Sequence, residues 1–380
     1  MRRLALLALG LSLLALPATS ALGRPTPGPV PDGFGSKNVE YIKLVEDEQL
    51  HGIGARLVGR YLYVTSVKTL TIYDVSKPTA PKLMSRTPIG GWENEDVATN
   101  GSVLIFADTR PNILRVFNVE DKTNPVEIAD VPDAASHTME CLFDCKWLYG
   151  STGLIVDIRN PEKPILQKEK WTDVTPFKDS SYPSHDLVEV RPGVLLTSSN
   201  PVLLLDARKD LLHPKIVATG DPGDTAFVHS AMWPQHGTDK IMMSAGETNA
   251  TPRCELGSAA FRTWDASSWK RTHTFHTIDS FTLHNGTATD GNPPVNGMGC
   301  STHWFEQNPA FNDGGIVGLG AYDHGTRFLH ITPAGKIHEA GYFMPVGAET
   351  SALHWITDRI VYSIDYTRGI DILRYTGPLK

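Results

Sequence analysis

The residues best suited to chemistry in this sequence are histidines that recur at intervals along the chain, each just ahead of a short apolar run. Aligning these runs gives one polar residue per repeated unit. Imidazole is the commonest protein ligand of zinc, copper and iron, so histidines from separate strands could hold an ion without a local motif. The aligned positions are His51, Glu93 or Glu95, His137, His185, His229, His303 and Thr350.

Five of these positions are the candidate ligands of a divalent or transition-metal ion. They are His137, His185, His229, His303 and Glu95. Glu95 is also a candidate acid, base or outer-shell residue, and no catalytic residue can be assigned. The alternative is that these residues have a purely structural role, because polar side chains that line a channel are often only solvated or hydrogen-bonded to the backbone. Ser136, Ser184 and Thr302 also precede a histidine, which fits that alternative.

The elements that must position these residues are short runs of β-branched and aromatic residues that close with Asp, Asn or His. Such runs are typical of strands that lead into a turn. Their return every 40 to 50 residues or so predicts a solenoid or propeller. The runs cover residues 70–76, 114–120, 153–159, 203–208, 261–267, 327–332 and 369–373.

Each repeated unit contains enough strands for one propeller blade. Residues 57–85 predict strands at 60–66, 70–75 and 82–86, with prolines in the connection before the last, and a further short strand precedes each unit. We therefore predict an all-β fold, a seven-bladed β-propeller of four-stranded antiparallel blades. Residues 39–45 form a spare strand, which we expect to complete the last blade. A parallel β-helix is the alternative, but its coils are shorter.

The segment from Gly153 to Ile158 resembles the signature strand of the LVIVD-repeat family of secreted or cell-surface bacterial propellers. The resemblance extends over nearly the whole mature chain, down to residues 360–371. It implies export, a propeller and an interaction role, and it supplies no agreed catalytic set.

The N-terminal residues have the layout of a secretory signal peptide. Arg2 and Arg3 precede an apolar run at 4–16, and small residues follow. We expect a signal peptide at 1–23, a flexible Pro- and Gly-rich leader at 24–36 and a single domain at 37–380. No later segment has the length of a membrane helix, so the sequence predicts a secreted protein without a membrane span.

Four cysteines in an exported chain predict two disulfides. The sequence allows three connectivities, and we favour Cys141 with Cys145, across a hairpin turn, and Cys254 with Cys300, around the longest irregular stretch. A zinc site is the rival, but the Cys-x3-Cys spacing has no matching second pair.

The formal net charge of −7 comes without a basic block, which argues against nucleic acid or an anionic membrane as partner. No nucleophile elbow, His-Glu-x-x-His motif or phosphate-binding glycine loop is present. These observations favour a monomeric binding module that takes an extracellular protein, glycan or small-molecule ligand. The alternative is a metal-dependent enzyme with a histidine-lined central channel.

Overall fold

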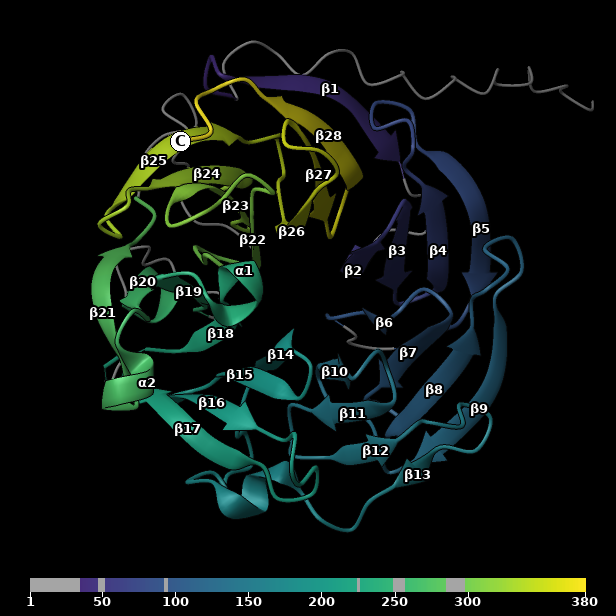
Figure 1. The fold of residues 1–380 in the computed structure, drawn as a ribbon. Coiled ribbons are helices and arrows are strands. Elements are labelled where there is room, and N and C mark those ends of the chain that lie inside the picture. The colour runs from purple at the N-terminus through teal and green to yellow at the C-terminus, as the bar shows by residue number, and fades with distance from the viewer. Residues whose placement is uncertain (1–34, 47–51, 92–94, 224–225, 249–256, 285–297) are drawn as a thin grey trace, which may run out of the picture.

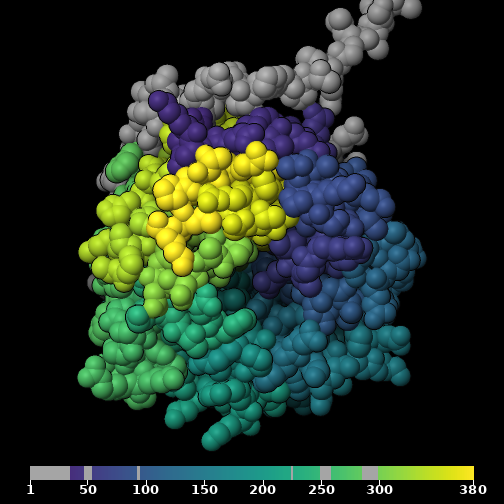
Figure 2. Space-filling view, turned by 45° about the horizontal axis from the view of Figure 1, so that its top comes forward, coloured from purple at the N-terminus to yellow at the C-terminus, as the bar shows by residue number. Residues whose placement is uncertain are grey.

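The strands of this protein form small antiparallel sheets that stand in a ring around a central axis (Figure 1). The computed structural model describes residues 35–46, 52–91, 95–223, 226–248, 257–284 and 298–380. After β1, which joins the last sheet, the described chain completes each set of four strands before it enters the next. The face seen in Figure 2 is hollowed at the middle of the ring. The prediction of an all-β propeller is confirmed.

Five sheets of the described chain have four strands each, and strands that are neighbours in a sheet are hydrogen-bonded. In pairing order, the first three contain β2 (Gly52–Val58), β3 (Tyr61–Ser66), β4 (Thr69–Asp74) and β5 (Lys82–Pro88); β6 (Ala98–Thr99), β7 (Val103–Asp108), β8 (Ile113–Asn118) and β9 (Val126–Pro132); and β10 (Met139–Leu142), β11 (Trp147–Gly150), β12 (Ile155–Asp157) and β13 (Ile165–Leu166). The other two contain β22 (Phe305–Gln307), β23 (Gly315–Gly320), β24 (Thr326–Ile331) and β25 (Ile337–Phe343); and β1 (Val39–Glu46), β28 (Gly369–Tyr375), β27 (Ile360–Asp365) and β26 (Thr350–Trp355).

The remaining sheet of the described residues has eight strands in two antiparallel halves. One half contains β14 (Asp186–Arg191), β15 (Val194–Ser198), β16 (Val202–Asp206) and β17 (Lys215–Gly220), and the other contains β18 (Val228–Met232), β19 (Ile241–Gly246), β20 (Phe261–Asp265) and β21 (Thr274–Phe281). A short parallel pairing of Thr219 and Gly220 with Thr274 and Phe275 joins the halves.

Four short helical turns connect the strands, and no helix of the described residues is long and apolar enough to cross a membrane. The turns are η1 (Trp171–Val174), α1 (Pro234–Gly237), η2 (Gly257–Ala259) and α2 (Trp269–Thr272).

In five of the repeated strands of the described chain, the polar residue that ends the strand makes the turn that follows. Asp74 Oδ1 accepts a hydrogen bond of 2.9 Å from the backbone amide of Ser76. Such a side chain imitates a turn of the backbone and directs the chain toward the outermost strand. The same bond to the amide two residues on is made by Asn118, Asp157, Asp206 and Asp265.

The ends of the described chain are joined in one sheet. β1 pairs antiparallel with β28, from Val39 opposite Tyr375 to Glu46 opposite Gly369, as predicted for residues 39–45. One apolar cluster joins this sheet to the first one: Leu62 and Tyr73 pack with Ile372, which has no exposed surface. The ring is therefore closed by hydrogen bonds and by a shared core.

One of the two predicted disulfides lies within the described residues and is confirmed. Cys141 and Cys145 are bonded, with Cα atoms 4.4 Å apart, across the turn from β10 to β11. In the second predicted pair, Cys254 lies outside the described residues, so the pairing of Cys254 with Cys300 stays a prediction.

Candidate metal centre

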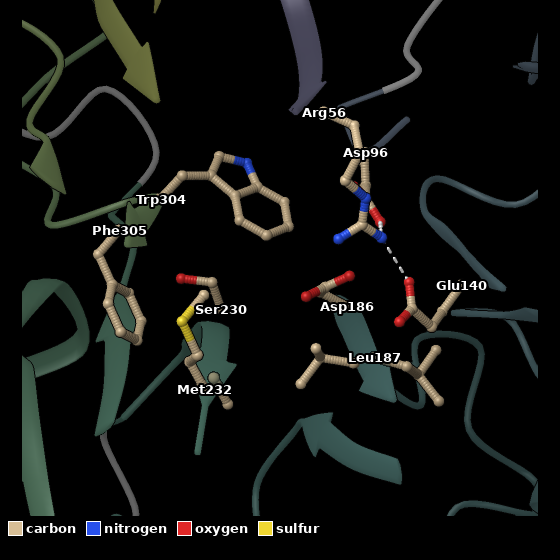
Figure 3. A pocket seen from close by; sticks show the side chains of 11 residues that line it. Arg56, Asp96, Glu140, Asp186, Leu187, Ser230, Met232, Trp304 and Phe305 are labelled. Carbon is tan, nitrogen blue, oxygen red and sulfur yellow. Dashed lines mark hydrogen bonds and ion pairs between the residues drawn. The ribbon is translucent and has the colours of Figure 1, made fainter. Parts of the chain in front are cut away.

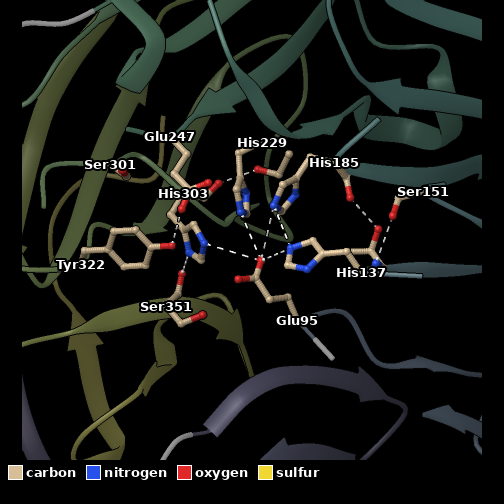
Figure 4. Close-up of polar contacts among 12 residues, drawn as sticks. Glu95, His137, Ser151, His185, His229, Glu247, Ser301, His303, Tyr322 and Ser351 are labelled. Atoms are coloured by element: carbon tan, nitrogen blue, oxygen red, sulfur yellow. Dashed lines mark hydrogen bonds and ion pairs between the residues drawn. The ribbon is translucent and has the colours of Figure 1, made fainter. Parts of the chain in front are cut away.

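The structure brings all five candidate ligands together at the inner ends of five successive strand sets (Figure 4). His229 lies in β18, and the other four lie just ahead of inner strands: Glu95 before β6, His137 before β10, His185 before β14 and His303 before β22. In Figure 1 these strands lie closest to the axis. Because each residue enters an inner strand from the same side, the ring gathers their side chains at one level.

The imidazole rings surround one carboxylate oxygen of Glu95. Its Oε2 lies 3.2 Å from Nε2 of His229, 3.4 Å from that of His137, and 3.8 Å from those of His185 and His303. Nε2 of His137 and Nε2 of His185 are 2.9 Å apart. All four histidines thus present the same nitrogen to the same point.

Packing holds the rings in this arrangement. The ring centroids of His185 and His229 are 3.7 Å apart, and those of His229 and His303 are 4.0 Å apart. Tyr322 covers His303 on its other side at 4.2 Å. His229 and His303 have no exposed surface and His185 has 3%. The ligand set is therefore built into the interior rather than onto a surface.

Hydrogen bonds at the rear of the site orient two of the ligands. The backbone oxygen of Ser351 lies 2.8 Å from Nδ1 of His303, so Nδ1 carries the proton and Nε2 keeps its lone pair. The Tyr366 hydroxyl donates to Oε1 of Glu95 at 3.3 Å and leaves Oε2 turned toward the histidines. Within the described part of the chain, Glu95 Oε2 and Nε2 of His229 and His303 have no hydrogen-bond partner.

The protonation states suit metal ligation. Burial and the neighbouring His229 hold the pKa of His185 and of His303 well below the usual range, so both rings are neutral at pH 7. Burial by itself would raise the pKa of Glu95, but contacts with the surrounding histidines, first those with His137 and His229, hold it well below its ordinary value. The site therefore offers lone pairs on nitrogen around an ionised carboxylate.

Three overlapping groups of residues place their ligand atoms within 4.8 Å of one another. Two nitrogens bound to one ion at about 2.0–2.1 Å and at right angles would be about 2.9 Å apart, the separation found between His137 and His185. The groups are Glu95 with His229 and His303, Glu95 with His137 and His185, and Glu247 with His185 and His229.

Not every aligned position belongs to the cluster. Thr350 is buried and its hydroxyl bonds to Asp365 instead, at 3.2 Å. His51 and Glu93 lie outside the described residues.

Sequence reasoning missed three residues of the site: Glu247, Tyr322 and Tyr366. Tyr322 donates a hydrogen bond of 2.8 Å to Glu247, which follows the end of β19. Tyr322 and Tyr366 lie in equivalent turns, between the second and third strands of their sheets. That equivalence is the signal in the sequence that could have found them.

Comparison with known proteins identifies the repeat and the fold. A family model for the LVIVD repeat matches residues 56–87, which agrees with the resemblance seen in the sequence. No curated protein sequence matches the chain. A chain of a mitotic checkpoint complex crystal structure superposes with a TM-score of 0.56 at 13% identity, over 98% of this chain and 99% of that one. The WD40 repeats of RRP9 superpose with a TM-score of 0.58 at 8% identity, over 91% and 98%. At such low identities these likenesses concern the fold alone.

Proposed function

We propose that this LVIVD-repeat β-propeller is a metal-binding protein that holds a divalent first-row transition-metal ion on its axis, between Glu95 and the four histidines. The proposal depends on one observation: four imidazole Nε2 atoms from separate strands converge on one buried carboxylate oxygen at 3.2 to 3.8 Å. An arrangement of this kind is required for coordination and is costly without a cation.

The cost arises because the converging atoms lie in a site shielded from water. Nε2 of His303 carries a lone pair, since its Nδ1 donates to Ser351, and an ionised Glu95 repels a lone pair directed at it. Buried polar atoms are normally hydrogen-bonded, yet three of these have no hydrogen-bond partner among the described residues. One cation would satisfy them together.

The kind of ion follows from the ligand types. Imidazole nitrogen with a single carboxylate suits zinc, copper, iron or nickel, whereas calcium and magnesium require mostly oxygen ligands. Because the three ligand groups overlap, an ion bound to three or four protein ligands would keep a position open for a further ligand. Such an open position is what a metal-dependent enzyme requires.

Seven blades and export by a signal peptide are further parts of the same proposal. Each half of the eight-stranded sheet corresponds to one blade, which with the five four-stranded sheets gives a seven-bladed propeller. The apolar run at 4–16 supports export by a signal peptide, and the Cys141–Cys145 disulfide is typical of an oxidising compartment. A role outside the cell in binding a protein or glycan is supported only by the fold, so the metal is the ligand that we propose first.

The test is elemental analysis of the protein purified without chelator, together with reconstitution of the apoprotein with zinc, copper, nickel and ferrous iron. We expect about one equivalent of one of these metals per chain in the wild type and its loss in His229→Gln. The matched control is His338→Gln, because His338 is exposed on β25. Absence of stoichiometric metal under all these conditions, or retention of metal in His229→Gln, would contradict the proposal.

A further inference from the structure

A second cluster of charged side chains lies beside the metal centre and has a cavity of its own (Figure 3). Its carboxylates come from Asp96, Glu140 and Asp186, and its one cation is Arg56. Asp96 and Asp186 directly follow Glu95 and His185 in the sequence, so the same inner strands supply both clusters. The two clusters differ in chemistry, because the second contains no imidazole facing the smaller cavity.

Arg56 compensates two of the three carboxylates. Its Nη2 donates to Glu140 at 2.7 Å and lies 3.7 Å from Asp96. Its Nε donates to the backbone oxygen of Val97 at 3.2 Å, which fixes the guanidinium on that side of the cavity. The third carboxylate, Asp186, is left without a cation of its own within 4 Å among the described ion pairs.

Asp186 is the side chain that indicates a ligand. It is 97% buried, since only 3% of its surface is exposed. Its Oδ1 has no hydrogen-bond partner within the described residues. Figure 3 shows its carboxylate directed into the cavity, opposite the indole of Trp304. A buried carboxylate oxygen without a partner is costly, and a cationic donor in the cavity would remove that cost.

The rest of the wall combines apolar and aromatic residues with Glu95, Glu306 and His354, which line only the larger cavity. Trp304, Phe305 and Met232 line both the cavity of about 50 Å³ around Asp186 and an adjoining cavity of about 180 Å³. The indole Nε1 of Trp304 also has no hydrogen-bond partner among the described residues. Aromatic faces attract organic cations, and the larger cavity has room for a short hydrocarbon body.

We infer that these joined cavities bind a small primary ammonium compound, with the ammonium group on Asp186 and its hydrocarbon body against Trp304 and Met232. A hard metal cation fits less well, because it requires six to eight oxygen ligands and two of the three carboxylates already serve Arg56. The site adjoins the metal centre, because Glu95 also lines the larger cavity, but the ammonium group is assigned to Asp186, which is not among the proposed metal ligands.

The test is calorimetric titration of chelator-treated protein with n-butylammonium chloride, with n-butanol as the neutral compound of similar shape. We expect one butylammonium per chain and binding of butanol at least tenfold weaker. Asp186→Asn keeps the shape but removes the carboxyl group that pairs with the ammonium group, and should weaken butylammonium binding at least tenfold. Asp130→Asn, on the exposed face of β9, is the matched control and should bind like the wild type.

Three outcomes would overturn the inference. Equal binding of butanol and butylammonium would show an apolar cavity without charge recognition. Displacement of butylammonium by calcium or magnesium at one equivalent would assign the site to an inorganic cation. Unchanged affinity in Asp186→Asn, in protein whose thermal melting shows that it is folded, would remove the assigned anion. Since the titration uses metal-free protein, its result does not depend on whether the proposed metal binds.

Discussion

His303 shows how one side chain is prepared for ligation by its surroundings. The backbone oxygen of Ser351 accepts a hydrogen bond from Nδ1 of His303. The rings of Tyr322 and His229 both pack against the imidazole. A ligand oriented in this way loses little side-chain entropy when the ion binds. The same logic applies to Glu95, whose Oε1 is occupied by Tyr366.

Replacement of Glu95 should weaken metal binding without unfolding the protein. Glu95→Gln keeps the size of the side chain but removes the carboxylate that lies within 4 Å of all four histidines, so we expect at least a roughly tenfold loss of affinity. Competition with a chromogenic chelator measures this change. Glu162→Gln, in an exposed turn, is the control and should keep wild-type affinity. Equal affinity in both variants would exclude Glu95 as a ligand.

A different glutamate should affect stability in a pH-dependent way. Burial and the nearby Asp323 raise the pKa of Glu349 to about 7. A carboxyl group whose pKa is higher in the folded state binds more protons there than in the unfolded state, so stability falls as the pH rises from about 4.5 through 7. Glu349→Gln should flatten this decline, by the order of 1 kcal/mol, in urea unfolding at pH 5 and pH 8. A decline of the same slope in the variant would contradict the assignment.

At the level of elements, the candidate ligands lie at the inner strands, whereas the outer strands share a recurring irregularity of pairing. In six of the strand sets of the described chain the pairing of the third and fourth strands shifts register near the same place, as between Ile72 and Tyr73 in the first sheet. Such bulges increase strand twist, which suits the outer part of a propeller blade. At the inner strands, the polar candidate ligands lie at the start of the strand or just ahead of it.

The disulfide at the β10–β11 turn should contribute to stability but not to metal binding. It closes a very short loop, for which the chain-entropy relation gives about 2 kcal/mol. The double substitution of Cys141 and Cys145 by serine should therefore lower the melting temperature. His137 enters β10 at the opposite end from this turn, so metal content should not change. A loss of metal would link the turn to the site.

The seam between the first and last sheets should be sensitive to loss of packing. Ile372→Ala removes a fully buried side chain from the cluster shared by both sheets, and we expect a loss of about 2–4 kcal/mol in unfolding free energy. Ile165→Ala is the control, because 58% of Ile165 is exposed, and it should cost less than about 0.5 kcal/mol. Similar losses in both variants would mean that packing between the first and last sheets adds no more to the unfolding free energy than an exposed side chain does.

For the whole molecule, we expect bound metal to stabilise the fold by linking the sheets of the ring. The candidate ligands come from five strand sets, so binding to the folded state alone raises stability by mass action. Free metal at about 100 times its dissociation constant adds roughly 2.7 kcal/mol. Thermal melting with and without a chelator measures this gain, and His229→Gln should abolish it. An unchanged melting temperature in wild-type protein would indicate that the ion is not bound between the sheets.

The sequence was sufficient to predict the ring of sheets and the convergence of the histidines, because each histidine occupies the same place in its repeat. The same alignment placed Thr350 with them, yet the hydroxyl of Thr350 bonds to Asp365. The direction of the Tyr322 side chain could not be predicted, for a local reason. It has a positive φ of 46°, and the direction of a side chain in such a turn depends on packing rather than on strand alternation. Binding of a metal stays a prediction.

The pairing of β1 with β28 also sets an order of events during synthesis. All five candidate ligands lie between residues 95 and 303, ahead of β26, β27 and β28. A chain that emerges from its N-terminus therefore presents its complete ligand set before the strands that close the ring have been made. If the ion binds as we propose, it can bind to the incomplete ring, and the last three strands then enclose it.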